Sequence, residues 1–223
     1  MPWAYDDEAV DVVRYFTAVK AKLMPYLYRN AIETSRTGVP MMRSMVLEFT
    51  SDLNCPYLDK QYMFSDSILV APVFNDESQA IYYLPEGNWT NYFTGEKKQG
   101  GCWYQEFCGY MSIPAFVREN SLVAVGARDD RPDYDYADNV TIKAYELKEG
   151  KETSTVVFSM DGSEETKVSV LKTDGYVHIC VESEKPCRIL FVGEHFEAGV
   201  GTVKEEGTLI SFKKGGKADF RLD

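Results

Sequence analysis

The N-terminal part of the chain has the apolar spacing of an amphipathic helix. Between residues 6 and 36, apolar side chains recur at intervals of three and four residues, which places them on one face of a helix. These side chains are Val12, Phe16, Val19, Leu23, Tyr26 and Leu27. The spacing therefore predicts a long helix with one buried stripe.

Both ends of this helix, and one interruption, can also be predicted. Asp6 or Asp7 suits the N-terminus, because a short acidic side chain accepts hydrogen bonds from the first amides and favours the positive end of the helix dipole. Pro25 cannot donate a backbone hydrogen bond, so we expect a kink there or a break after Met24. Gly38 then suits the C-terminal cap.

After residue 40 the apolar pattern shortens to that of strands. Short apolar or alternating runs are separated by Gly, Pro, Asn and Asp, which predicts a β-domain with a short helix at 55–64. Its predicted strands are 41–49, 67–74, 80–85, 89–95, 102–107, 111–120 and 121–126. The turn sequence PEGN is expected to join 80–85 and 89–95 as a hairpin.

A polar stretch, ARDDRPDYDYADN (127–139), interrupts the strands and is expected to be an inter-domain linker or an entry loop. Turn signals at hairpin spacing then separate a second set of strands, which is typical of an antiparallel sandwich. The predicted strands are 140–147, 153–160, 165–173, 175–182, 187–193, 208–213 and 218–222. We therefore predict a mainly β chain with two antiparallel sandwiches, divided into 1–38, 39–126 and 127–223.

Charge and hydropathy disfavour several classes of partner. The net charge of −11 repels phosphate backbones, and no cluster of five basic residues occurs, so nucleic acid is not expected. No apolar run approaches the ~18 residues of a membrane-spanning helix. The N-terminus lacks the positive region of a secretion signal, so a cytoplasmic location is expected unless a preceding segment is missing.

The residues that commonly carry chemistry are few. The five cysteines, Cys55, Cys102, Cys108, Cys180 and Cys187, are odd in number and lack CxxC spacing, which predicts reduced thiols and no zinc site. We expect no metal and no cofactor. The segment GVGTVKEEG (199–207) lacks the GK[ST] of a phosphate loop and predicts a hairpin turn.

Neither histidine supports a catalytic triad. His178 alternates with apolar neighbours, as a strand residue does, and His195 lies in a turn-like sequence. The sequence contains no GxSxG motif.

The carboxylates do not identify a glycosidase pair either. Asp6, Asp7 and Glu8 are explained by helix capping, and Asp52, Asp59 and Asp66 are spread through a loop and a short helix. No catalytic residue is therefore assigned.

Three long blocks of the sequence nevertheless resemble a known enzyme family. These are PWAYDDEAVDVVRYFTAVKAKLMPYLYRNA, GVPMMRSMVLEF and YLDKQYMFSDSILVAPVFNDESQAIYYLPEGNWTNYFTG. In this order they resemble glycoside hydrolase family 31, in particular its bacterial α-xylosidases. The resemblance covers residues 1–126, and the remaining residues fall where that family has its outermost sandwich.

The resemblance implies a parent enzyme much larger than this chain. In the family, a (β/α)₈ barrel carries two catalytic aspartates of a retaining mechanism, and two β-domains follow it. This chain resembles the part after the last active-site loop, so residues 6–36 would be the final barrel helix. The family's catalytic aspartates and substrate-binding histidine have no counterparts here, and the chain alone is expected to be inactive.

Three roles remain open for such a chain. The first is a non-catalytic C-terminal portion that supports the missing catalytic portion and subunit assembly. The second is a carbohydrate-binding module, with Trp89, Tyr134 and Tyr136 as candidate rings for stacking on sugars, although core packing is favoured for Trp89. The third is a purely structural interaction domain. Without the barrel, the helical stripe would lack its partner, so a homo-oligomer is also expected.

Overall fold

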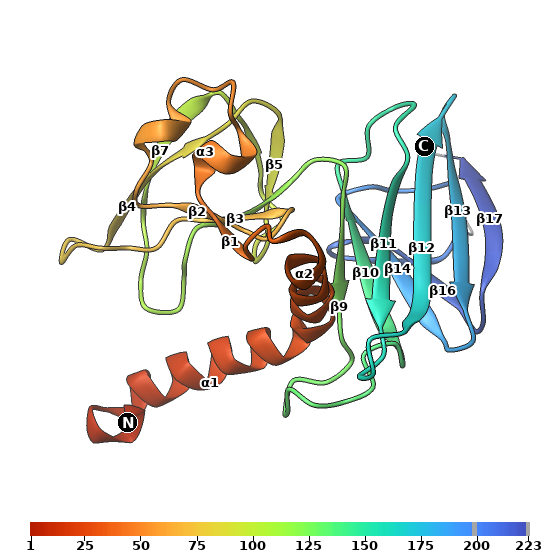
Figure 1. The fold of residues 1–223 in the computed structure, drawn as a ribbon, viewed down its shortest axis with the longest axis horizontal. Helices are drawn as coiled ribbons and strands as arrows, with labels where there is room; N and C mark the ends of the chain where they lie inside the picture. Colours follow the sequence, from red (N-terminus) through yellow and green to blue (C-terminus); the bar gives the residue numbers. More distant parts are fainter. Residues whose placement is uncertain (198–199, 222–223) are drawn as a thin grey trace.

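The computed structural model describes residues 1–197 and 200–221, which form two helices followed by two β-sandwiches (Figure 1). The N-terminal elements are η1 (Pro2–Ala4), α1 (Asp7–Lys22) and α2 (Met24–Thr37). The proximal sandwich contains β1 (Met42–Arg43), α3 (Met45–Glu48), η2 (Cys55–Tyr57), β2 (Tyr62–Phe64), β3 (Ile68–Val70), β4 (Gln79–Leu84), β5 (Asn88–Asn91), β6 (Lys97–Gln99), β7 (Cys102–Phe107) and β8 (Ala115–Arg118).

The distal sandwich begins with β9 (Ser121–Val125) and continues to the end of the described chain. Its other strands are β10 (Val140–Tyr145), β11 (Thr153–Phe158), β12 (Glu164–Thr173), β13 (Tyr176–Ser183), β14 (Cys187–Val192), β15 (Thr202–Lys204), β16 (Gly207–Phe212) and β17 (Gly216–Arg221). The prediction of a mainly β fold with multiple antiparallel sheets is confirmed.

The helical segment ends where the sequence predicts but is broken in the middle. Asp6 caps α1 by accepting a 2.7 Å hydrogen bond from the amide of Ala9. Gly38 ends α2 in the left-handed conformation, with φ of 77°. The break falls at Leu23, one residue before the predicted position, and Pro25 lies in the first turn of α2. Proline is tolerated there because first-turn amides have no partner within the helix.

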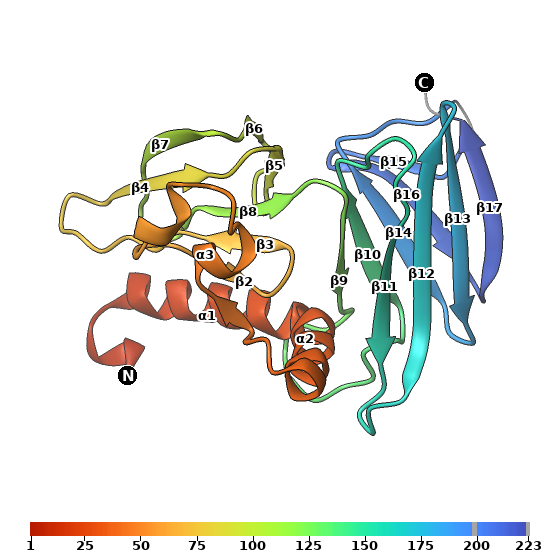
Figure 2. The ribbon, with the colours of Figure 1, turned by 45° about the horizontal axis from the view of Figure 1, so that its top comes forward.

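The proximal sandwich pairs a large sheet with a small one. Its six-stranded sheet has the order β1-β2-β3-β8-β5-β6, and β4 and β7 form a separate two-stranded sheet (Figure 2). The buried side chains between them include Met63, Leu69, Tyr82, Trp89 and Phe116. These residues form the proximal core.

The expected hairpin between 80–85 and 89–95 is wrong. Strand β4 pairs with β7, whereas β5 pairs with β6 and β8, so the PEGN turn carries the chain from one sheet to the other. The indole of Trp89 donates a 2.7 Å hydrogen bond to the carbonyl of Pro85, which holds this crossing in place.

The predicted strand at 41–49 is also corrected. Only Met42–Arg43 pairs, with β2, and a short helix follows at Met45–Glu48. The helix buries Met45 and lets Glu48 reach back to the guanidinium of Arg43, which an extended strand would not allow. Similarly, the helix expected at 55–64 is reduced to one 3-10 turn before β2.

The distal sandwich is built from a five-stranded sheet, β15-β16-β14-β10-β9, and a four-stranded sheet, β11-β12-β13-β17. One pairing departs from the predicted antiparallel pattern, because β10 and β14 are parallel. Between the sheets, inward side chains such as Ile142, Val168, Ile179 and Ile189 make a closed apolar core.

The segment 121–126 joins the distal sandwich instead of closing the proximal one. Strand β9 pairs antiparallel with β10 over five residues, from Ser121 to Val125. Both its faces are covered, because Leu122 and Ala124 enter the distal core while Val123 faces the helices. The alternating pattern identifies the strand, but a strand buried on both faces does not reveal its sheet.

A third core joins the helices to both sandwiches. Leu23 and Tyr26 from the helical segment contact apolar side chains of β3 and β8 on one side and of β9, β10 and β14 on the other. The third core also explains why all of β3 is apolar, since Leu69 faces the proximal core while Ile68 and Val70 face α2.

Candidate functional site

The loop after β9 holds the break between the two helices. Tyr134 donates a 2.8 Å hydrogen bond from its hydroxyl to the carbonyl of Ala21, and the amide of Gly126 donates at 2.7 Å to that of Lys22. Asp129 adds a 3.4 Å ion pair with the Lys22 ammonium. These contacts satisfy carbonyls that the end of α1 leaves without helical partners. The stretch 127–139, expected as a linker, therefore has a structural role at this break.

The tyrosines proposed as sugar platforms are packed inside this loop. Tyr136 is 2% exposed, and its hydroxyl donates to the carbonyl of Pro132. Tyr134 is half-buried, and its ring meets that of Tyr136 edge-on at 5.0 Å. Burial raises the pKa of both phenols. Tyr136 therefore presents no open face to a sugar, whereas Tyr134 is partly exposed and its stacking on a sugar stays a prediction.

Trp89 is a core residue, as its sequence context favours. It is 1% exposed and packs in the proximal core, with its ring centroid 6.2 Å from that of Phe49. Its polar nitrogen is satisfied by the backbone, so the indole has neither a free face nor a free donor.

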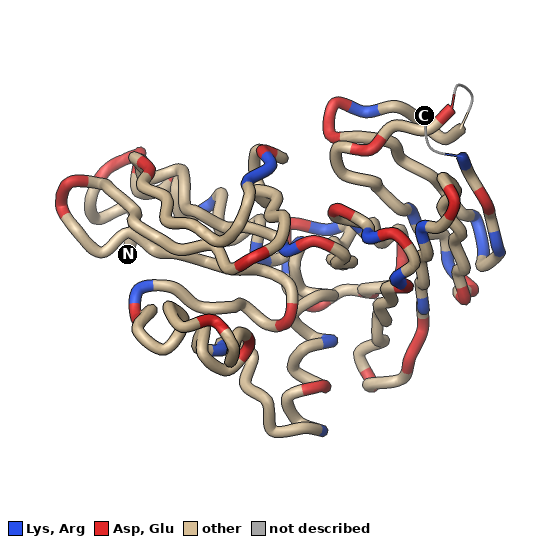
Figure 3. Tube along the Cα trace, turned by 90° about the horizontal axis from the view of Figure 1, so that it is seen from above, with Lys and Arg blue, Asp and Glu red and all other residues tan. Residues whose placement is uncertain are grey.

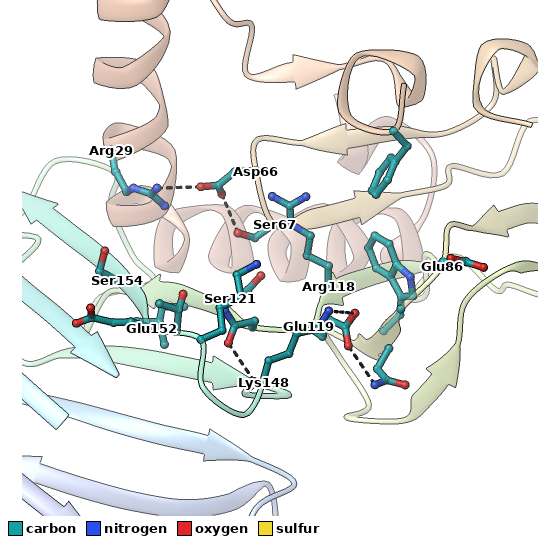
Figure 4. A pocket seen from close by; sticks show the side chains of 18 residues that line it. Arg29, Asp66, Ser67, Glu86, Arg118, Glu119, Ser121, Lys148, Glu152 and Ser154 are labelled. Atoms are coloured by element: carbon teal, nitrogen blue, oxygen red, sulfur yellow. Dashed lines mark hydrogen bonds and ion pairs between the residues drawn. The ribbon is translucent and has the colours of Figure 1, made fainter. Parts of the chain in front are cut away.

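A polar hollow lies where the two sandwiches meet α2. We call it the seam cleft; it has a volume of about 480 Å³ (Figure 4). Its walls come from α2, the residues before β3, the turn before β5, the β8–β9 connection and the β10–β11 connection. The side chains that carry its main contacts are Arg29, Asp66, Asn88, Glu119 and Lys148.

One wall of the seam cleft is an ion pair between α2 and the proximal sheet. The Arg29 guanidinium lies 2.8 Å from one carboxylate oxygen of Asp66, and Ser67 donates to the other oxygen at 2.8 Å. Burial acts to raise the pKa of Asp66, but Arg29, Ser67 and Arg118 outweigh it and hold that pKa below its usual range. Asp66 is therefore a fixed, ionised acceptor.

The opposite wall is a second pair that bridges the two sandwiches. Glu119 accepts from the Lys148 ammonium at 2.8 Å and from the side-chain amide of Asn88 at 3.1 Å. The side-chain oxygen of Asn120 also accepts a 3.1 Å hydrogen bond from the backbone amide of Lys148. Figure 4 shows Glu119 and Lys148 next to each other at the hollow, one from the β8–β9 connection and the other from the β10–β11 connection. Of the cleft residues, sequence reasoning considered only Asp66 and Trp89, because the others come from distant segments.

Two of the other carboxylates considered in the sequence have structural partners. Asp52 accepts a 3.0 Å hydrogen bond from the Tyr83 hydroxyl, and Asp6 caps α1. Within residues 1–197 and 200–221, no cluster of three or more His, Cys, Asp or Glu side chains is arranged to hold a metal.

The histidines and thiols also lie apart from the seam cleft. His178 lies on β13, as predicted, and its Nδ1 is 2.7 Å from Asp219 on the neighbouring strand. His195 is exposed in the connection after β14. All five cysteines are free, in agreement with the prediction of reduced thiols.

The N-terminal half of α1 is a second candidate interaction surface. Helix α1 extends along one side of the proximal sandwich, and the single buried residue described in it, Ala21, lies in its last turn (Figure 2). Val13 is 48% exposed, and Trp3 and Tyr5 just before the helix are exposed as well. No helix in the described part of the chain is long and apolar enough to cross a bilayer. We call the exposed apolar side chains Trp3, Tyr5 and Val13 the helix patch.

Charged residues do not gather on one side of the molecule. Figure 3 shows basic and acidic positions distributed along both sandwiches, although acidic residues outnumber basic ones and give a net charge of −11. Neither the seam cleft nor the helix patch coincides with a one-sign surface.

Two family models match successive parts of the chain. Residues 38–123 match the model described as the glycosyl hydrolase family 31 C-terminal domain. Residues 135–222 match the model described as the C-terminal domain of α-xylosidase YicI. Both matches fall after the helical segment.

Curated relatives extend the likeness. The α-xylosidase XylQ of Lactiplantibacillus pentosus is 37% identical over 80% of this chain, and the match covers 24% of that protein. An α-xylosidase of Emericella nidulans is 38% identical over 64% of this chain and 19% of its own length. The chain thus spans about a quarter of these relatives or less.

Solved structures show the same fold with little sequence identity. A family 31 dextranase of Flavobacterium johnsoniae superimposes with a TM-score of 0.83 at 22% identity, over 99% of this chain and 34% of that one. A cycloalternan-forming enzyme of Listeria monocytogenes gives a TM-score of 0.86 at 20% identity, over 100% of this chain and 25% of that one. These structures show the shared fold, and the two family models with the α-xylosidase relatives show that the chain belongs to glycoside hydrolase family 31 and corresponds to the C-terminal part of its enzymes.

Proposed function

We propose that this chain is the non-catalytic C-terminal region of an α-xylosidase-like glycosidase and that it supports a (β/α)₈ catalytic barrel. In this proposal α1 and α2 form the last helical segment of the barrel. The parent enzyme would hydrolyse α-glycosidic bonds, with its nucleophile and acid/base on strands outside this chain.

The observation that carries the proposal is the uncovered helix patch. The helix α1 has an apolar stripe, and in its N-terminal half Phe16 and Tyr15 face Phe93 of the sandwich at ring distances of 6.2 and 6.3 Å. Val13 and Tyr5 face outward. Such a surface gains stability from a neighbour, because each apolar side chain removed from water contributes roughly 1.5–3 kcal/mol.

The third core explains how a barrel could be supported at this position. α2 is enclosed by both sandwiches and is linked to the turn before β3 through the Arg29–Asp66 pair. The loop after β9 fixes the carbonyl end of α1 through Tyr134. A barrel attached to α1 would therefore be tied to a rigid base and not to a flexible linker.

The proposal is tested by restoring activity between two separate chains. The catalytic portion of the parent enzyme is expressed alone and mixed with this chain, and hydrolysis of a nitrophenyl α-xyloside is measured. We expect this chain alone to be inactive, since without an acid and a nucleophile the ~10⁶-fold or larger acceleration of an enzyme has no source. Mixing should restore activity.

A matched pair of variants locates the contact. Val13→Glu places a charge in the helix patch and should weaken the restored activity about tenfold or more, since burying an unpaired charge costs more than 1.4 kcal/mol. Val203→Glu places the same charge on exposed β15 and should have no effect. Turnover by this chain alone, or equal effects of both variants, would contradict the proposal. Light scattering on this chain alone reports whether a second copy covers the helix patch instead.

A further inference from the structure

The seam cleft has a balanced set of charges. Four cationic and four acidic side chains line it, although the chain as a whole has a net charge of −11. The two central pairs, Arg29–Asp66 and Lys148–Glu119, each close at 2.8 Å. A charged ligand would meet as much repulsion as attraction and would have to compete with these pairs. The cleft is therefore suited to a neutral ligand.

The polar groups of the cleft remain able to bind more than they already hold. A carboxylate offers about four acceptor positions and a guanidinium five donors, so each member of an ion pair retains capacity toward the cleft. Asn88 and Ser121 add an amide and a hydroxyl. A ligand hydroxyl donates and accepts at once, so it can bridge a donor and an acceptor without breaking their pair.

The cleft also has apolar wall surface next to these groups. This surface comes from Phe49, which is partly exposed, whereas Leu122 and Trp89 border the cleft with only 3% and 1% of their surface exposed. A sugar ring presents both hydroxyls and apolar C–H faces, so it could match the polar and the apolar walls of the cleft together. Ligand sites occur preferentially at domain interfaces, at volumes of roughly 300–1,000 Å³. The seam cleft meets both conditions.

We propose that the seam cleft binds a short neutral oligosaccharide. The ligand would contact Asp66 and Asn88 of the proximal sandwich and Lys148, Lys151 and Ser154 of the distal one. Binding is a property of this chain alone and does not depend on a catalytic partner. It also differs from the expected sugar stacking on Trp89, Tyr134 and Tyr136, because here hydrogen bonds from fixed ion pairs provide the recognition.

The test is calorimetric titration of the full chain with maltotriose and, separately, with cellotriose as probes of α- and β-linked neutral sugars. At least one should bind saturably at millimolar concentration, and NMR should show the amides of Asn120 and Lys148 shifting with the same curve. Because the ligand contacts both sandwiches, it should also raise the thermal unfolding midpoint. Sulfate, as a simple anion, should give no saturable signal.

Variants separate this cleft from the rest of the surface. Ser154→Trp fills the cleft from β11 and should reduce affinity about tenfold or more, the effect of losing ~1.4 kcal/mol. Lys151→Met removes one exposed donor and should reduce affinity about threefold to tenfold. Ser211→Trp puts the same bulk on exposed β16, outside the cleft, and should change nothing.

Three outcomes would overturn the proposal. The first is the absence of saturable binding of both trisaccharides by the folded chain. The second is saturable binding of sulfate without sugar binding, which would make the cleft an anion site. The third is sugar binding that Ser154→Trp and Lys151→Met leave intact, which would place the sugar elsewhere. Lys151→Met keeps the test decisive if Ser154→Trp does not fold, because its side chain is exposed.

Discussion

The two halves of the helical segment have similar sequence patterns and different surroundings. In α1, Ala21 is the single residue among those described that is fully buried, and it lies in the last turn. In α2, Pro25, Tyr26 and Asn30 are buried, and the helix lies between the two sandwiches (Figure 1). Helical spacing therefore identifies an apolar face, but it does not say whether a partner for that face is present in the same chain.

The polar contacts of the two helices differ in the same way. The Asp11–Arg14 pair of α1 is exposed on both sides and links residues one turn apart. The Arg29–Asp66 pair of α2 joins the helix to the turn before β3, with each side chain about one-fifth exposed. Exposed pairs contribute little to stability, whereas partly buried pairs that join distant segments contribute more. We therefore expect α2 to hold the seam and α1 to offer a surface.

The largest expected effect is on stability: truncating a tyrosine of α2 should cost much more than truncating a tyrosine of α1. Tyr26 is 0% exposed, and its hydroxyl donates a 2.8 Å hydrogen bond to the carbonyl of Phe64. Tyr26→Ala should destabilise the chain by about 3–5 kcal/mol, because it opens a cavity in the third core. Tyr15→Ala on α1, where the side chain is 38% exposed, should cost less than about 1 kcal/mol. Urea unfolding measures both.

Equal effects of the two variants would remove the distinction between the helices. A large loss of stability in Tyr15→Ala would mean that α1 is already covered, either by the chain itself in solution or by a second copy. Light scattering on the same sample separates these two cases.

The ion pairs of the two helices should also differ, by a smaller amount, in how their contribution to stability depends on pH. The pKa of Asp66 is lowered in the fold, since burial acts to raise it but Arg29, Ser67 and Arg118 outweigh burial. A depressed acid pKa stabilises the fold above the unfolded value of ~3.9, and this contribution is lost as the pH falls through the folded pKa. Asp66→Asn should therefore cost about 1.5–3 kcal/mol at pH 7. The difference in free energy of unfolding between Asp66→Asn and the unmodified chain should shrink below about pH 4.

Asp11→Asn on α1 is the matched control for this comparison. It removes a carboxylate from an exposed pair. The free energy of unfolding should therefore change by less than about 0.5 kcal/mol, both at pH 7 and at low pH. A constant penalty for Asp66→Asn across the pH range would show that shape, not charge, explains the role of Asp66.

The sequence was most informative where one face of each strand is buried. Within 140–221 the predicted strands correspond to β10–β14, β16 and β17, because inward residues such as Ile142 and Val168 alternate with outward polar ones. The caps of the helical segment at Asp6 and Gly38 were also predictable, since each rests on a short-range rule. Local patterns thus give the elements and their ends.

Partners between distant segments were not predictable from those patterns. The turn before β5 looks like a hairpin, yet Trp89 belongs to a different sheet from β4. Strand β9 reads as the last proximal strand, yet Val123 faces the helices from the distal sheet. The seam cleft combines residues as far apart as Arg29 and Lys148, so no local motif contains it. Such a site requires the tertiary structure.

The smallest expected effect concerns the point where the two helices meet. The Tyr134 hydroxyl donates to the carbonyl of Ala21 at 2.8 Å, and this carbonyl lies at the end of α1. Tyr134→Phe keeps the ring against Tyr136 and removes only the hydrogen bond, so it should cost about 0.5–1.5 kcal/mol in urea unfolding. Tyr5→Phe is the control, because Tyr5 is 82% exposed and its hydroxyl remains hydrated. If Tyr134→Phe also increases hydrogen exchange in α1 but not in α2, the loop after β9 secures the exposed helix specifically. Equal changes in both helices would show instead that they open as one unit, and the contrast between them would then be confined to burial.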